Sequence, residues 1–303
     1  MKPGNISLVK LSHNLLLLGV LLLAFGLRAL GLDRQSLSMD EVAELMIGRS
    51  ALRDLLFAHD GFPPLYHTIL HGWLSLFPGN LAARWLSVLL GTLSVWAVWG
   101  IARRAGGDRT ALWAALLVAV SPFHVWHSQE ARAYVLYYLL AALALWGFFT
   151  ALETNSPRAW LSYVAAALAG LLTHYYFALL VVANLAMLFV EFRGRGQWRR
   201  AIIAHTALVV FSLPVLWLLH GDLSSEAAVP FATQFHPAAI GYAVFSFLTG
   251  YALGPSPREL HGMPAARAVT EILPWLILTG TAAGVLLLNG LRRLGSGRWT
   301  SRL

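Results

Sequence analysis

The sequence contains no cysteine, so it can form neither a disulfide framework nor a thiolate metal site. Any metal would need histidine and carboxylate ligands. Charged residues are also scarce, at 12% of the 303 residues, whereas soluble domains contain about 25%. So little charge cannot coat a soluble globule. The chain has no internal repeat and no low-complexity tract, which leaves its long apolar stretches as the main feature.

Hydrophobic residues make up 58% of the chain, and several stretches reach the about 17 to 25 apolar residues that span a bilayer. The sequence therefore predicts an all-α polytopic membrane protein of about eight transmembrane helices. The first stretch follows Lys2 and Lys10 but is longer than the apolar core of a signal peptide, so we interpret it as a retained helix. The expected spans are residues 14–32, 81–101, 110–123, 132–152, 159–175, 177–192, 201–219 and 271–290.

The distribution of basic residues predicts the orientation of these spans. With the N-terminus and the C-terminus in the cytoplasm, 14 of the 22 Lys and Arg residues lie inside, and 11 of the 14 acidic residues lie outside. The net charge of +8 is then explained by contact with an anionic inner leaflet, so no nucleic-acid partner is expected. Nine of the 11 histidines also lie outside, which gathers the residues capable of chemistry on one face.

Two outer segments are longer than simple connectors, at residues 33–80 and 221–270. The first contains Ser38 and Glu41, which fit the two ends of a capping box, and an amphipathic helix expected along the membrane interface. A short apolar stretch at 65–77 follows a Pro-Pro pair and is expected to lie on or dip into the outer leaflet. The second segment is rich in glycine, proline and aromatic residues and is expected to be ordered by packing.

Asp40 and Glu41 follow the first span, where carboxylates would lie near lipid headgroups. Glu41 has an equally good structural explanation as the capping-box acid. Asp40 is the better candidate for a general base, because the helix terminus would keep it ionised at neutral pH.

Glu130 and Arg132 lie close to hydrocarbon between two spans, where ionisable residues are costly and are functional candidates. Arg132 suits a phosphate, since a guanidinium fork matches phosphate oxygens, although a local ion pair that caps the next helix remains an alternative. Arg28 and Arg84 are further candidates for phosphate contacts. Their positions near span ends are explained equally well if the side chains extend to the outer membrane interface.

Histidine and aromatic residues accompany these charges, and histidine with carboxylate can bind a divalent metal. No tight ligand motif such as HExxH is present, so hydrogen-bonded interfacial histidine is favoured. Most of the aromatic residues fit a membrane-interface belt, and a minority would line a sugar or polyprenyl site.

The chain resembles the bacterial members of the protein O-mannosyltransferase-like group, which includes aminoarabinose-transferase-like enzymes. These are membrane glycosyltransferases of the C-type fold that use polyprenyl-phosphate sugars. Three patterns carry the resemblance: Ser-Leu-Ser-Met-Asp-Glu at 36–41, Pro-Pro-Leu-Tyr at 63–66, and the segment 121–134 with its Gln-Glu-Ala-Arg centre. Residues 173–175 and 250–256 add weaker support.

The resemblance implies that Asp40 is the catalytic base, that Glu41 supports it, and that Glu130 with Arg132 lies near the lipid phosphate. Sugar or lipid contacts are expected from a further set of side chains, which comprises Tyr66, His127, Tyr134, His174 and Tyr175.

Two departures from the family pattern limit the resemblance. Phe62 stands where many relatives have a histidine, which leaves only His59, Asp60 and Glu130 as weak metal candidates. The chain also ends at Leu303, where relatives usually continue through further helices. Residues 1–303 are therefore expected to form a single transmembrane domain that lacks those helices.

The expected function is transfer of a sugar, with inversion, from a polyprenyl-phosphate donor to a lipid, glycan or protein acceptor outside the cytoplasm, as in lipopolysaccharide or protein glycosylation at a bacterial inner membrane. No cofactor is expected with certainty, and a divalent metal stays possible. The alternative is a flippase or transporter for lipid-linked sugar. A transporter should place ionisable residues near the bilayer midplane and on both sides, whereas these crowd one face.

Overall fold

The computed structural model describes residues 3–56, 62–191, 198–224, 238–250, 254, 259 and 262–295. Every regular element within these ranges is an α-helix, which confirms the predicted all-α class for this part of the chain. Contacts divide the chain into two units, Met1–Ala119 with His127–Phe231, and Val120–Trp126 with Ala232–Leu303.

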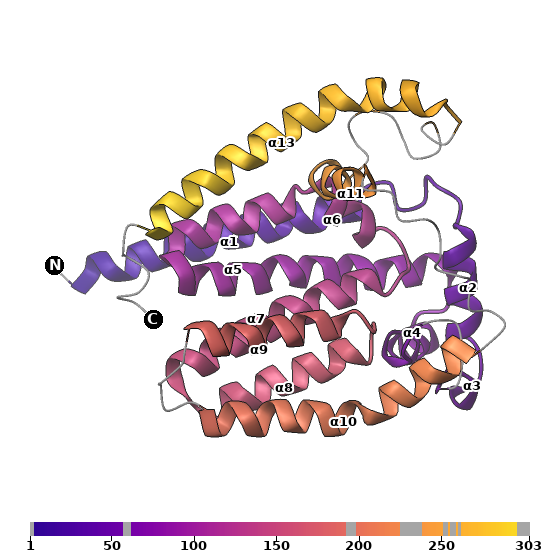
Figure 1. The fold of residues 1–303 in the computed structure, drawn as a ribbon, viewed down its shortest axis with the longest axis horizontal. Helices are drawn as coiled ribbons and strands as arrows, with labels where there is room; N and C mark the ends of the chain where they lie inside the picture. The colour runs from indigo at the N-terminus through magenta and orange to yellow at the C-terminus, as the bar shows by residue number, and fades with distance from the viewer. Residues whose placement is uncertain are drawn as a thin grey trace. The chain divides into compact units, whose positions relative to one another are not determined.

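The first unit holds most of the helices (Figure 1). They are α1 (Pro3–Ala29), α2 (Met39–Gly48), α3 (Leu52–Leu56), α4 (Leu65–Leu76), α5 (Asn80–Ala119), α7 (Tyr134–Thr154), α8 (Pro157–Leu171), α9 (Phe177–Glu191) and α10 (Trp198–Ser224).

Four helices in the described ranges are long and apolar enough to cross a membrane, within Asn80–Ala119, Tyr134–Thr154, Trp198–Gly221 and Arg267–Asn289. The shorter apolar helices His13–Ala29 and Phe177–Phe189 accompany them. The protein is therefore a multi-pass membrane protein. The expected spans at 159–175 and 177–192 correspond to α8 and α9, which at 15 residues each are shorter than the about 20 residues that cross hydrocarbon.

The longest helix, α5, folds back on itself at Gly107, whose φ of 79° and ψ of −174° are not helical. Val95 and Ala119, on either side of this glycine, pack in one cluster against Ala24 of α1. A straight helix would separate those two residues by about 36 Å. The segment is thus two antiparallel helices joined at a glycine, which is the arrangement expected of the separate stretches 81–101 and 110–123.

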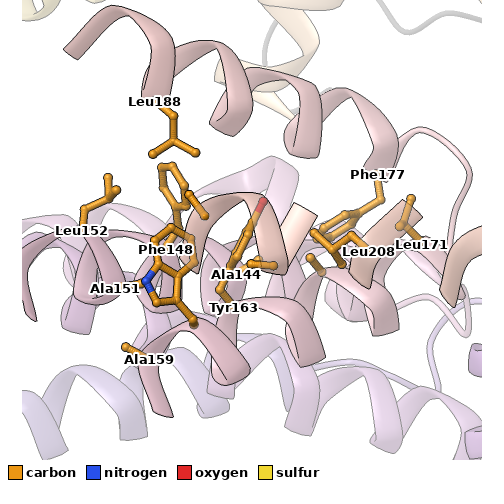
Figure 2. Packing of buried hydrophobic residues seen from close by; sticks show 14 residues of the cluster. Ala144, Phe148, Ala151, Leu152, Ala159, Tyr163, Leu171, Phe177, Leu188 and Leu208 are labelled. Carbon is orange, nitrogen blue, oxygen red and sulfur yellow. The ribbon is translucent and has the colours of Figure 1, made fainter. Parts of the chain in front are cut away.

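The apolar core of the first unit lies among α7, α8, α9 and α10, which run side by side in Figure 1. Figure 2 shows Phe148 of α7, Tyr163 of α8 and Leu188 of α9 within this cluster. The Tyr163 hydroxyl lies 3.3 Å from His205 Nε2 on α10, which satisfies a polar group inside the bundle. Tyr134 begins α7, the helix that contributes Ala144, Phe148 and Ala151 to this core.

Helix α4 packs against α2 and against one end of α5. A Cβ on Gly48 would lie 3.0 Å from the Leu70 side chain, so a glycine allows this approach. His71 Nδ1 also lies 3.0 Å from the Gly48 carbonyl oxygen. The single amphipathic helix expected in the first outer segment is divided in the structure, since α2 ends at Gly48 and α3 begins at Leu52.

The second unit contains α11 (Ala238–Thr249), α13 (Ala265–Gly295) and the first residues of α6 (Pro122–Ser128). The Phe123 and Phe247 rings meet edge to face with centroids 4.9 Å apart. At Gly250, with a φ of 55°, an added Cβ would lie 2.2 Å from the Phe123 backbone nitrogen. Only glycine permits this approach. The helix α11 was not predicted, because the second outer segment was expected to be ordered by packing and not by regular hydrogen bonding.

Candidate active site

The predicted capping box is present at the start of α2. The Ser38 hydroxyl accepts a hydrogen bond from the Glu41 backbone N–H at 3.2 Å, and the Ser38 N–H donates to Glu41 Oε2 at 2.9 Å. This cap fixes the first turn and sends its two acidic side chains in different directions. Asp40 has 72% of its side chain exposed, whereas Glu41 is buried.

Glu41 forms a buried ion pair with Arg84 of α5. Its two carboxylate oxygens accept bonds of 2.7 Å from Arg84 Nε and Nη2, and Oε1 also accepts the Ala131 N–H at 3.0 Å. Arg84 uses its other donors on the carbonyl oxygens of Leu32, Gln35 and Ser36. Burial by itself would raise the pKa of Glu41, but the hydrogen bonds from Arg84, Ser38 and Ala131 outweigh it and hold the pKa below its ordinary value.

Contacts of Ser128, Gln129 and Ala131 hold the loop before α7 in place. Arg28 Nε donates to the Ser128 hydroxyl at 3.2 Å, and the Gln129 amide donates to the Leu27, Arg28 and Leu30 carbonyl oxygens at the end of α1. Ala131 is fully buried. Glu130 and Arg132 flank it, and both remain partly accessible.

Arg132 lies at the centre of the site. Its Nη1 is 3.2 Å from Asp40 Oδ2, and its Nη2 donates to the Tyr134 hydroxyl at 3.3 Å. The guanidinium carbon lies 5.4 Å from the Phe62 ring centroid and 5.3 Å from that of Tyr134, which is the geometry of cation–π contact. The structure thus brings together Asp40 and Arg132, which are 92 residues apart in the sequence.

Glu44 is a member of the site that the sequence interpretation missed. It follows Asp40 by one helical turn on α2, and only 4% of its side chain is exposed. Its Oε1 lies 4.0 Å from Arg132 Nε, and its Oε2 lies 2.9 Å from Nε2 of the buried His67 on α4. The spacing of four residues between two acids was the available signal, because residues i and i+4 share a helix face.

The remaining predicted residues form the wall of the site. His127 Nδ1 lies 3.4 Å from Glu130 Oε2, and the His127 ring meets the Tyr134 ring with centroids 5.3 Å apart. His174 meets Phe62 edge to face at 5.2 Å and also faces Tyr134. Burial lowers the pKa of His174, so this imidazole is neutral at neutral pH. Tyr175, between α8 and α9, is partly exposed.

Three of the predicted ligands have other roles in the structure. All five N–H donors of Arg84 are used within the chain. Arg28 is fully buried and donates to Ser128 and to the carbonyl oxygens of Ala24, Val118 and Ala119. Tyr66 is fully buried, which raises the pKa of its hydroxyl. We therefore do not assign phosphate contacts to Arg28 and Arg84, nor a sugar contact to Tyr66.

The described residues contain no group of three or more His, Asp or Glu side chains that could hold a metal. Glu130, one of the weak metal candidates, has His127 as its only ion-pair partner among those residues. The other two candidates, His59 and Asp60, lie outside the described ranges.

The sequence profile of the dolichyl-phosphate-mannose-protein mannosyltransferase family matches residues 62–220, which is just over half of the chain. The chain belongs to this family. Membership implies a membrane glycosyltransferase and confirms the resemblance seen in the motifs. The matched range includes Phe62, Glu130 and Arg132, while Asp40 and Glu44 precede it. A search of curated proteins found no match to the chain.

Proposed function

We propose that the protein is an inverting glycosyltransferase that moves a sugar from a polyprenyl-phosphate donor to an acceptor hydroxyl on the non-cytoplasmic side. The observation that carries this proposal is the pairing of an exposed carboxylate, Asp40, with the ring-flanked guanidinium of Arg132 at 3.2 Å. The proposal assigns the carboxylate as the base and the guanidinium as the phosphate ligand. These are the two groups that transfer from a sugar phosphate requires.

Asp40 acts as the general base in this proposal. Its carboxylate accepts the proton of the acceptor hydroxyl while the acceptor oxygen forms a bond to the anomeric carbon. The bond from that carbon to the phosphate oxygen breaks, and its electron pair leaves with the polyprenyl phosphate. Attack from the face opposite the leaving group inverts the anomeric carbon. A single base suffices because the phosphate is a good leaving group.

Arg132 binds the phosphate and offsets the negative charge that the leaving oxygen gains. Its guanidinium stays charged and can present two N–H groups to phosphate oxygens. The Phe62 and Tyr134 rings limit the movement of the group, which favours a fixed geometry.

Glu130 is assigned to hydroxyl groups, because a carboxylate would repel the phosphate. Its pairing with His127 at 3.4 Å orients the carboxylate beside Tyr134. His174, which burial keeps neutral, and Tyr175 complete the wall that would face the sugar or the start of the lipid chain. Flat apolar faces suit both of these groups.

The test of this proposal measures transfer of labelled mannose from polyprenyl-phosphate mannose by the full chain in proteoliposomes, with acceptor-containing membrane extract. Asp40→Asn should lower the rate at least 100-fold, since a positioned general base contributes about 10² to 10⁴. Glu130→Gln should lower it as well. Asp54→Asn is the matched control, because Asp54 is an exposed acid on α3.

Wild-type rates in Asp40→Asn, at equal amounts of folded protein, would refute the role of the base. If the wild type moves fluorescent lipid-linked sugar between leaflets and transfers none, the protein is instead a flippase. Because the assay contains one donor sugar at a time, repeating it with a pentose donor tests the sugar class separately from the chemistry.

A further inference from the structure

The guanidinium of Arg132 has a different partner at each nitrogen. Nη1 faces Asp40 at 3.2 Å, Nη2 faces the Tyr134 hydroxyl at 3.3 Å, and Nε faces Glu44 at 4.0 Å. The two carboxylates come from successive turns of α2 and approach different edges of the same group. One cation is therefore shared between two acids that the helix holds apart.

These two acids differ in their exposure to solvent. Asp40 has 72% of its side chain exposed, whereas Glu44 has 4%. An exposed ion pair is weakened by water and salt, and an incoming anion can replace its carboxylate at little cost. A buried carboxylate has no comparable access to water, so leaving its cation is costly. A phosphate that arrives at Arg132 should therefore displace Asp40 and leave Glu44 in place.

The Glu44 carboxylate also contacts His67, through the oxygen that does not face Arg132. His67 Nε2 on α4 lies 2.9 Å from Glu44 Oε2, and 1% of the His67 side chain is exposed. Neighbouring Tyr66 and Leu70 on α4 are fully buried in a cluster that also contains Leu45 of α2. The carboxylate of Glu44 is thus fixed between two helices and cannot follow a moving guanidinium.

We propose that Glu44, held by His67, is a positioning residue that keeps Arg132 in place while the donor phosphate takes the position of Asp40 on it. Donor binding thereby releases Asp40 to accept the acceptor proton. This inference rests on the proposed function and adds an order to it, because the base becomes available only after the phosphate is bound.

The test measures binding of polyprenyl phosphate without sugar to the full chain in nanodiscs. Glu44→Gln keeps the size of the side chain and removes its charge. A carboxylate with no positioning role would repel the phosphate, so its removal would tighten binding. The positioning role predicts the opposite sign, with Kd raised about tenfold. Glu153→Gln is the matched control on α7, since Glu153 pairs with Arg104 near the far end of that helix from Tyr134.

A double-mutant cycle separates positioning of Arg132 from a general effect on the fold. In the Arg132→Gln background, Glu44→Gln should change Kd less than twofold, because the group that it positions is absent. An equal loss in both backgrounds would overturn the inference. In the transfer assay, Glu44→Gln should raise KM for the donor more than it lowers kcat.

Glu44→Asp provides a second variant if Glu44→Gln fails to fold. It keeps the charge but withdraws the carboxylate by one methylene, and it should raise Kd about threefold. Unchanged Kd in the folded Glu44 variants, alongside normal sugar transfer by the wild type, would overturn the inference alone. If the effects of Glu44→Gln and Arg132→Gln on Kd are coupled as predicted but the wild type transfers no sugar, the proposed function is overturned and the positioning role stays intact. A wild type that does not bind polyprenyl phosphate would overturn both.

Discussion

Replacing Glu41 by glutamine removes the negative charge that faces Arg84 inside the protein. The Ser38 and Ala131 N–H groups donate to different carboxylate oxygens of Glu41, so the single oxygen of glutamine can accept a bond from one of them and not from both. Its amide nitrogen must then lie toward the guanidinium, where two donors face each other. Arg84 keeps its three carbonyl partners but loses the carboxylate that neutralises it. The variant therefore leaves a buried cation without a counter-ion.

Loss of one partner from a buried ion pair costs about 3 to 5 kcal/mol of folding free energy. A folded domain of 150 to 250 residues loses about 2 to 4 °C of Tm for each kcal/mol. With about 2 °C for each kcal/mol, a loss of about 3 to 5 kcal/mol means that Glu41→Gln should reduce Tm by roughly 6 to 10 °C. The pair joins the first turn of α2 to α5, so the loss should also loosen the helix that carries Asp40.

The assay is thermal unfolding of the purified protein in detergent, followed by intrinsic tryptophan fluorescence. Glu153→Gln is the control for removing a carboxylate from an ion pair, because the Glu153–Arg104 pair is partly exposed and such pairs contribute about 0 to 1 kcal/mol. The double variant Glu41→Gln with Arg84→Met should be more stable than Glu41→Gln alone, since it removes the uncompensated cation as well.

A Tm within about 2 °C of the wild type for Glu41→Gln would refute the structural role, given the magnitude expected above. If sugar transfer were lost at the same time, Glu41 would belong to the reacting groups instead. A double variant less stable than Glu41→Gln would show that the three carbonyl contacts of Arg84, and not its charge, dominate the energetics.

Two further predictions concern the same framework. Because the folded-state pKa of Glu41 is depressed, its contribution to stability is present above the unfolded pKa of about 4.3 and is lost as the pH falls through the folded pKa. The difference in Tm between wild type and Glu41→Gln, measured from pH 7 to pH 3, should therefore narrow at the acidic end. A constant difference in Tm would contradict the pairing of Glu41 with Arg84. Gly91→Ala places a Cβ 2.3 Å from the Ser128 hydroxyl oxygen, so it should lower the free energy of unfolding by about 1 to 3 kcal/mol and displace the loop that carries Arg132. Gly26→Ala is the control, because its Cβ would have no atom within 4 Å and should not destabilise the protein. Equal melting temperatures for the two variants would show that the loop is not held at Gly91.

Local features of the site were predictable from the sequence because their causes are local. The capping box of Ser38 and Glu41 depends on four adjacent residues, and the structure has it as predicted. The apolar stretches depend on composition and length, and they appear as helices. The division between α2 and α3 was not predicted, because a weakly periodic apolar pattern does not show where a helix ends.

The sequence also placed Glu130 and Arg132 near a site without showing what holds them. The loop is fixed by Gln129, whose amide contacts carbonyl oxygens at the end of α1 about 100 residues earlier. Periodicity says nothing about such contacts. Arg28 and Arg84 looked like phosphate ligands for the same reason, since an arginine near a span has the same sequence pattern whether its partner is a ligand or a buried carbonyl oxygen.

The sequence by itself determined the helical class, the family motifs, the cap that starts α2 and the apolar stretches, which in the described residues include four helices long enough to cross a membrane. Hydrophobicity and capping are properties of adjacent residues, so they do not depend on the rest of the fold. The tertiary structure alone decided which acid does what on α2. Glu41 is neutralised by Arg84, Glu44 is enclosed by His67, and Asp40 is left exposed beside Arg132. Burial sets these roles, and burial exists only once α2, α4 and α5 have packed together.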